Sequence, residues 1–188
     1  MPDRYAQRMS ARPSLSLAEW TVLGVLSQQS AHGFAVAQLT APGGQLGRIW
    51  HIPRPVVYRS IGRLAAAGLV TPESTEPGQG PQRTIYAATP HGRQAFERWL
   101  DTPVQHVREI RSHLLLKLAL LDRAGRDPTG LLRRQRAVLE PIALAIEAGS
   151  PPRTGFDATL DVWRRVTATA ALDFLDTVTR DQPATRPR

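Results

Sequence analysis

No helix can cross residues 72–81, because this run of ten residues holds three prolines and two glycines. Short β-prone stretches flank it, Leu69-Val70-Thr71 before it and Thr84-Ile85-Tyr86-Ala87 after it. The pattern predicts a two-stranded ribbon with a Gly/Pro-rich tip.

Three helical segments are expected before the ribbon, over residues 16–29, 33–40 and 54–67. Ser16 and Glu19 have the Ser-x-x-Glu spacing of a capping box, which marks the start of the first helix. Pro53 and Pro55 suit the entry of the third helix, and Gly68 suits the position just past its end.

A fourth helix is expected after the ribbon, with Thr89 as its N-cap and Pro90 at its first position. Three helices, a ribbon and a helix in this order are typical of a winged helix-turn-helix domain. We therefore expect such a domain over residues 15–103, preceded by an N-terminal arm over residues 1–14.

Beyond residue 103 the chain is predicted to be almost entirely helical. Apolar residues recur at steps of three and four from Val107 to Leu121. Asp127-Pro128 opens a further helix that runs to about Ala148, and Pro141 inside it is expected to kink or split it. The predicted fold class is mainly α: a winged helix-turn-helix domain followed by an all-helical dimerisation domain.

The last expected helix, residues 156–179, has apolar spacing close to a heptad seam, formed by Phe156, Leu160, Trp163, Thr167, Ala170, Phe174 and Val178. Leu160, Trp163 and Phe174 are predicted to form a homodimer interface, and the alternative is a flat hydrophobic effector that stacks on Trp163. Residues 104–180 are thus expected to form a dimerisation and effector domain, and residues 181–188 a disordered tail.

The charge of the chain points to an anionic partner. Its 24 Lys and Arg residues exceed its 16 Asp and Glu residues, which gives a net charge of +8. Residues 1–93 hold nine Arg against four acids, and carboxylates would oppose the approach of phosphates. An Arg-rich genome would explain the preference for Arg over Lys, but not the scarcity of acids, so double-stranded DNA is the favoured partner.

The third expected helix has two different faces. Val57, Ile61 and Leu64 form its apolar face. The opposite face is cationic, contains no acid and is otherwise small, so it could lie deep in a DNA groove while its Arg side chains bond guanine edges or phosphates. The DNA contacts predicted on this helix are Arg54, Pro55, Tyr58, Arg59, Gly62 and Arg63. An ordinary solvated face is the alternative.

Arg83, at the base of the ribbon tip, is a further predicted DNA contact in the minor groove or on the backbone, with a solvated strand residue as the alternative. The five His residues follow no metal-ligand spacing, the chain has no Cys, and no Gly-rich phosphate loop is followed by Lys-Ser or Lys-Thr. We therefore expect no catalytic residue, no metal and no cofactor, and hence no enzyme.

No apolar run is long enough to span a bilayer, and the start of the chain leads into no apolar signal segment. A soluble, cytoplasmic protein without a membrane partner is expected.

Three segments, in order, resemble PadR-family transcriptional regulators. Residues 52–70 carry a Tyr-x-x-Leu-x-x-Leu-x-x-x-Gly-Leu pattern from Tyr58, with Ile61 where Leu is usual. Residues 32–36 are similar to the element Tyr-Gly-Tyr-x-Ile, with His in place of the first Tyr. Residues 83–92 are similar to Arg-x-x-Tyr-x-Leu-Thr-x-x-Gly, with Ala in place of Leu. The helical second half resembles the larger PadR subfamily by architecture and length.

The resemblance implies a homodimeric repressor that reads an inverted-repeat operator with one recognition helix per half-site, and a phosphate contact by Tyr58. Release of the operator by a small-molecule or other effector is expected. The alternative is a winged-helix protein-interaction module without specific DNA binding.

Overall fold

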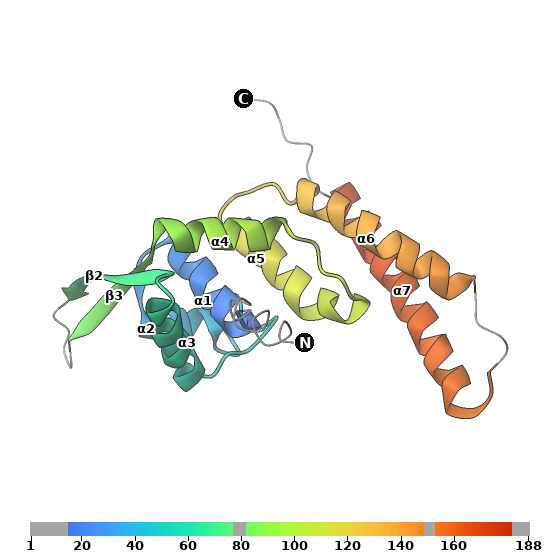
Figure 1. Ribbon diagram of the computed structural model, residues 1–188, viewed down its shortest axis with the longest axis horizontal. Coiled ribbons are helices and arrows are strands. Elements are labelled where there is room, and N and C mark those ends of the chain that lie inside the picture. The colour runs from blue at the N-terminus through green and yellow to red at the C-terminus, as the bar shows by residue number, and fades with distance from the viewer. Residues whose placement is uncertain (1–14, 77–81, 149–152, 182–188) are drawn as a thin grey trace, which may run out of the picture. The chain divides into compact units, whose positions relative to one another are not determined.

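The computed structural model describes residues 15–76, 82–148 and 153–181 (Figure 1). Its helices and strands are α1 Leu17–Gln28, β1 Ala31–His32, α2 Gly33–Thr40, α3 Arg54–Ala66, β2 Val70–Glu76, β3 Arg83–Ala88, α4 Pro90–Asp101, α5 Leu115–Arg123, α6 Thr129–Glu147 and α7 Gly155–Asp181. The mainly helical fold class is confirmed. The chain forms two compact units, one up to Phe96 and one from Glu97 onward, so the division falls within α4.

The helix ends of the first unit follow the predicted capping signals. Ser16 Oγ accepts a hydrogen bond from Glu19 N at 3.3 Å, and the Glu19 carboxylate accepts from Ser16 N at 2.7 Å, which completes the capping box of α1. Gly68 follows α3 with a φ of +68°, in the left-handed region that favours glycine. Thr89 Oγ1 accepts from Gly92 N at 3.0 Å and caps α4.

The core of the first unit lies among α1, α2, α3 and the sheet, and Val57, Ile61 and Leu64 of α3 are buried in it as predicted. Other members are Val22, Leu23, Val25, Leu26, Val36, Leu46, Ile52, Leu69, Val70, Ile85 and Phe96. With one face of α3 held in this core, its opposite face is left exposed.

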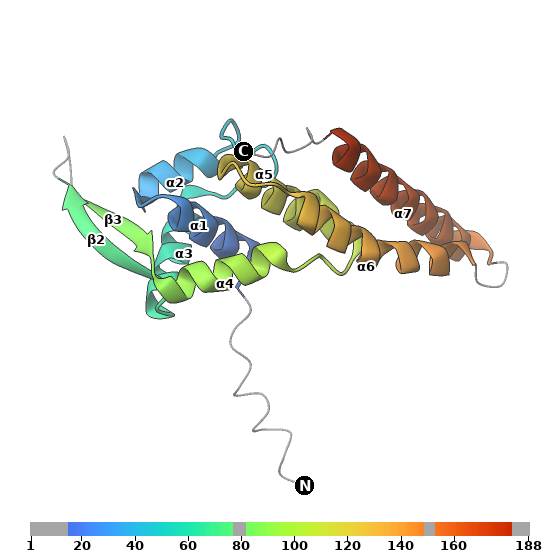
Figure 2. The same ribbon diagram turned by 90° about the horizontal axis from the view of Figure 1, so that it is seen from above.

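The described sheet is antiparallel, in the order β1-β3-β2, and the β2–β3 ribbon extends away from α1, α2 and α3 (Figures 1 and 2). β2 is longer than predicted and continues to Glu76, because a bulge between Pro72 and Ser74 accommodates the proline on an edge strand. β1 is too short for a sequence pattern to indicate. The predicted ribbon tip, residues 77–81, lies outside the described residues.

The second unit consists of helices, and α6 packs along α7 (Figures 1 and 2). The helix expected from Val107 begins irregularly, with a 3-10 turn at Val107–Glu109 and a π turn at Ile110–Leu114, before α5. α6 is a single helix through Pro141, so of the predicted kink or split the split is wrong. α7 includes Asp181, which was predicted to belong to the tail, and residues 182–188, like the arm 1–14, lie outside the described residues.

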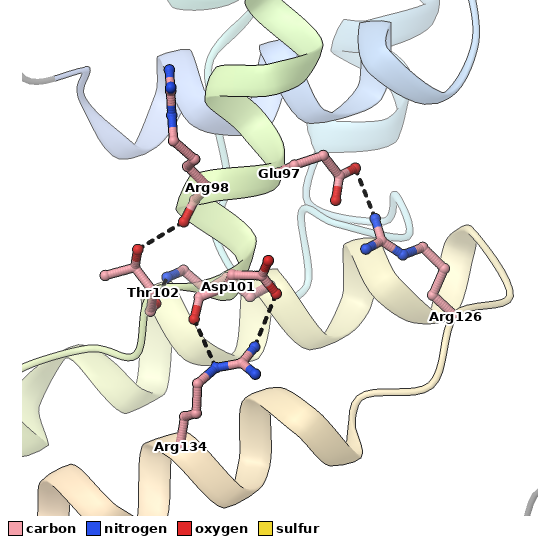
Figure 3. Close-up of polar contacts among 7 residues, drawn as sticks. Glu97, Arg98, Asp101, Thr102, Arg126 and Arg134 are labelled. Carbon is pink, nitrogen blue, oxygen red and sulfur yellow. Dashed lines mark hydrogen bonds and ion pairs between the residues drawn. The ribbon is translucent and has the colours of Figure 1, made fainter.

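The last turns of α4 are linked to the loop between α5 and α6, and to α6 itself, by several polar contacts. Arg126 pairs with Glu97 at 2.8 Å, and Arg134 reaches both the carboxylate of Asp101, at 2.9 Å, and its carbonyl oxygen, at 3.0 Å (Figure 3). These three links join exposed groups, so each adds little stability by itself.

The Lys117 ammonium lies beneath this end of α4, inside the second unit. It donates to the carbonyl oxygen of Thr102 and lies 4.7 Å from the centroid of the Trp99 ring. Lys117 is only 2% exposed, and its burial is the main cause that lowers its pKa from 10.5 to about 8. A cation is therefore held in the interior of this unit.

Candidate nucleic-acid interface

All seven residues predicted to contact DNA lie at the surface of the first unit. Four of them, Arg54, Tyr58, Gly62 and Arg83, line one groove of about 460 Å³ between the outer face of α3, the start of α2 and the base of β3. Pro55, Arg59 and Arg63 lie on α3 outside the lining of this groove. The fold thus brings the predicted wing contact together with the predicted recognition helix.

The groove contains cations and hydrogen-bond donors. Its full lining is His32, Gly33, Phe34, Arg54, Tyr58, Ile61, Gly62, Gln82, Arg83, Thr84 and Tyr86. Within the part of the chain that the structure describes, no carboxylate lines it. A concave surface of this composition suits an anion with several acceptor oxygens, such as a phosphate.

The guanidinium groups of two arginines, Arg54 and Arg83, lie close to the ring of Phe34. The guanidinium carbon of Arg54 lies 5.1 Å from the centroid of the Phe34 ring, and that of Arg83 lies 5.7 Å from it. Arg54 also lies 5.7 Å from the centroid of the Tyr58 ring. These distances are in the range of cation–π attraction.

Tyr58 lies against the start of α2, where residue 33 has no side chain. A Cβ atom on Gly33 would come within 2.7 Å of Tyr58 Cε1, so the ring can take this place only beside a glycine. The Tyr58 side chain remains 45% exposed. Its ring is thus supported from one side, while part of it is open to a partner.

Arg63 and Arg59 differ in their partners. Arg63 pairs with the buried carboxylate of Glu19 at 3.1 Å, although its own side chain is 71% exposed. Among the described residues, the Arg59 guanidinium forms no ion pair with a carboxylate and no hydrogen bond. Arg59 is therefore free to bind an external group, as is Arg54 at the start of α3, and a DNA contact by Arg63 stays a prediction.

Seven residues that line this groove were not predicted to contact DNA, five of them aromatic or polar. Phe34 looks like an ordinary apolar member of a short helix, and His32, Gln82, Thr84 and Tyr86 are single polar residues in loops or strands. The resemblance of residues 32–36 to a family element was the one signal that could have drawn attention to Phe34. Its contacts with Arg54 and Arg83 depend on the fold and are not indicated by the sequence.

In the second unit, the predicted interface residues of α7 differ in exposure. Trp163 is 65% exposed, whereas Leu160 and Phe174 are half-buried. The residues of α7 that are buried are Ala168, Ala171 and Leu175. A separate hollow of about 290 Å³ in this unit is lined by Leu118, Ala119, Asp122, Arg126, Pro128 and Val178. A role of Leu160, Trp163 and Phe174 at an interface remains a prediction.

The described residues contain neither a metal-binding cluster nor a membrane-spanning helix. No cluster of three or more His, Asp or Glu side chains there could hold a metal ion. None of the helices described is both long and apolar enough to cross a membrane.

The first unit is a winged helix-turn-helix domain, with α3 as the second helix of the helix-turn-helix and β2–β3 as the wing. Residues 22–98 match the "Transcriptional regulator PadR-like family". The chain therefore carries a PadR-like transcriptional regulator domain, which confirms the resemblance seen in its motifs. Among curated proteins, none is similar enough to count as a match.

Several solved structures are similar over most of the chain. Bacillus subtilis PadR in complex with operator DNA is 17% identical, with a TM-score of 0.44 over 86% of this chain and 93% of that one. The same protein in complex with p-coumaric acid is 14% identical, with a TM-score of 0.39 over 87% and 93%. The PadR-like regulator BC1756 from Bacillus cereus is 15% identical, with a TM-score of 0.37 over 87% and 96%.

Gly62 offers a direct test of which surface of α3 meets DNA. A Cβ atom on Gly62 would have no neighbour within 4 Å in the free protein. Gly62→Ala should therefore stabilise the folded protein by roughly 0.5–1 kcal/mol, because glycine is a poor helix former. Gly62→Leu should fold equally well and yet weaken duplex binding about tenfold or more, because its side chain would fill the space of the DNA.

Thermal unfolding and fluorescence anisotropy with a labelled duplex measure the two effects separately. Ala67→Leu is the matched control, because Ala67 is also exposed but lies at the C-cap of α3, rotated away from the face that carries Gly62. Full duplex affinity in Gly62→Leu would mean that this part of α3 does not enter a groove.

Proposed function

We propose that the protein is a sequence-specific, homodimeric DNA-binding repressor that is released from an inverted-repeat operator by an effector. α3 enters the major groove in each half-site, and the base of the wing contacts the adjacent backbone. The observation that carries the proposal is the acid-free groove in which Arg54 and Tyr58 of α3 meet Arg83 of the wing. The PadR-like domain supports the same conclusion.

The second helical unit supplies the dimer in this proposal. α7 buries one apolar face against α6 and leaves a second one exposed, where Phe156 is 76% and Trp163 65% exposed, with Val162 and Val166 beside them. Large apolar side chains gathered on one surface favour a protein partner. A second copy of the same helix fits, because such a stripe is complementary to itself.

Effector release requires no more than a difference in affinity. A molecule that binds the DNA-incompetent state better than the DNA-bound state shifts the population away from the operator.

The experiment that tests DNA binding is a titration of the full chain with a labelled duplex from the DNA upstream of its gene, repeated from low to high salt. If each protomer of a dimer places Arg54 and Arg83 on the DNA backbone, the logarithm of the affinity should fall as the logarithm of the salt concentration rises. The slope should be about −2 if the two arginines share one phosphate, and about −4 if each binds its own.

A footprint on the same DNA then locates the two half-sites. No duplex binding at low salt, or an affinity that does not change with salt, would instead favour the protein-interaction module.

The dimer is tested by a substitution on the exposed face of α7. The wild-type chain should elute as a dimer at micromolar concentration, and Trp163→Ser should move it to the monomer, because it removes the largest exposed apolar side chain of the stripe. Light scattering coupled to size-exclusion chromatography measures both states.

Arg165→Ser is the control, since residues two positions apart lie on nearly opposite sides of a helix. A wild-type monomer, or a Trp163→Ser variant that remains a dimer, would contradict the interface proposed for α7.

A further inference from the structure

We propose that Phe34 is a positioning residue of the DNA site, which holds Arg54 and Arg83 together as a clamp for one phosphate group of the DNA backbone. This inference rests on the proposed function and extends it to the way the wing and the recognition helix act together. Phe34 itself makes no polar contact, so its effect is exerted through the two arginines.

The cluster around Phe34 carries an uncompensated positive charge. Two guanidinium groups lie within 5.7 Å of the centroid of one phenyl ring, so two like charges are held in the same small region. No carboxylate among the described residues lines the groove to offset them. An anion would therefore be attracted to this region. A phosphate matches both the charge and the hydrogen-bond donors of the two arginines.

The Phe34 ring is held in place by its neighbours at the start of α2. Phe34 lies in the first turn of α2, where His32 Nδ1 accepts a hydrogen bond from Ala35 N at 3.0 Å and caps the helix. The His32 ring also stacks on the Phe34 ring, at 6.2 Å between centroids and an interplanar angle of 27°. Phe34 is half-buried, so one side of the ring is held by the protein while the arginines lie at the surface.

Contact with the Phe34 ring restricts the Arg54 and Arg83 side chains before DNA binds. Long side chains lose rotamer freedom when they bind, and an arginine already resting on an aromatic face loses less. Arg54 begins the recognition helix, and Arg83 begins the second strand of the wing. The shared Phe34 ring therefore preorganises the guanidinium groups of Arg54 and Arg83 to bind the same phosphate.

The test uses a fluorescein-labelled duplex of mixed sequence at low salt, because a phosphate clamp acts on any DNA. Phe34→Leu keeps an apolar side chain but removes the ring, and should weaken duplex binding about tenfold. Phe34→Tyr keeps the ring and should bind within about twofold of the wild type.

A coupling measurement separates positioning from mere support of the fold. In an Arg54→Ala, Arg83→Ala background, Phe34→Leu should cause no further loss, since the groups that it positions are absent. The same loss in both backgrounds would overturn the proposal, as would wild-type affinity in Phe34→Leu.

The two arginine substitutions give a second, independent readout that does not depend on Phe34→Leu folding. If Arg54 and Arg83 bind one phosphate, the loss in the double variant should be smaller than the product of the two single losses. Strictly multiplicative losses would overturn the shared clamp. A wild-type chain that binds no duplex would overturn the proposed function itself, and normal wild-type binding with any contrary variant overturns the clamp alone.

Discussion

Arg59→Ala should weaken binding to the operator duplex by about 1–3 kcal/mol, a loss of roughly 5- to 150-fold, with little change in the stability of the fold. Arg59 lies on the exposed face of α3, between the groove residues Tyr58 and Gly62 and away from the core. The arginine next along this face, Arg63, is paired with Glu19, whereas Arg59 is not engaged within the described chain. An arginine presented in this way is suited to bidentate bonding of guanine.

A gel-shift titration with the duplex protected in the footprint measures this loss, and Arg133→Ala on α6 is the control for the removal of one positive charge from an exposed position. Comparison with a mixed-sequence duplex separates the two kinds of contact, because a base contact affects the operator more than unrelated DNA. Unchanged operator affinity in Arg59→Ala would refute its role as a reading residue.

Much of the first unit could be predicted because its signals are local. A capping box at Ser16, prolines before α3 and a glycine after it each act within one helical turn, so they work in the same way in any fold. The motif signals of the family lie in the same segments, and the match over residues 22–98 confirmed them.

The departures from prediction arise where packing outweighs local preference. Pro141 removes one backbone hydrogen bond from α6, yet the helix continues, since Leu139 and Ala143 on either side of it are buried in the second unit. In β2, Pro72 is tolerated because it lies at a bulge on an edge strand. Neither compensation can be recognised from the neighbouring residues alone.

In the candidate site, too, local features could be predicted from the sequence, whereas contacts between elements could not. The cationic face of α3 follows from helical periodicity, which a sequence displays directly. The contact of Arg54 and Arg83 with Phe34 joins three elements, and nothing in the spacing of these residues indicates it. Lys117 is a similar case: in the sequence it is the one lysine on an apolar helix, and only the fold shows that it is buried.

Lys117→Met should therefore stabilise the folded protein at pH 7, by on the order of 1–3 kcal/mol. Burial lowers the pKa of Lys117 to about 8, while the nearby carboxylates of Glu109 and Asp101 act in the opposite direction. At pH 7 the amine is still charged, and a pKa lowered from 10.5 to about 8 corresponds to about 3 kcal/mol of unfavourable burial. Methionine fills a similar space without the charge, although it leaves the carbonyl of Thr102 without its donor, which costs about 1 kcal/mol.

The pH dependence of the wild-type chain gives a second measure of the same effect. Between about pH 8 and 10.5 the unfolded chain holds the proton of Lys117 and the folded chain does not. Because the unfolded state then binds more protons, the free energy of unfolding should rise with pH across this range. Lys117→Met should lack this rise, and so should Lys117→Arg, whose charge persists at every pH in the range.

Urea unfolding at pH 7, 8, 9 and 10, followed by tryptophan fluorescence, compares the three proteins. If Lys117→Met were less stable than the wild type at pH 7, and the wild-type stability were flat from pH 8 to 10, the ammonium would be stabilising the end of α4 through Trp99 and Thr102 by more than its burial opposes. The expected result is the reverse, because desolvation of a lysine that is 2% exposed outweighs one hydrogen bond and one aromatic contact.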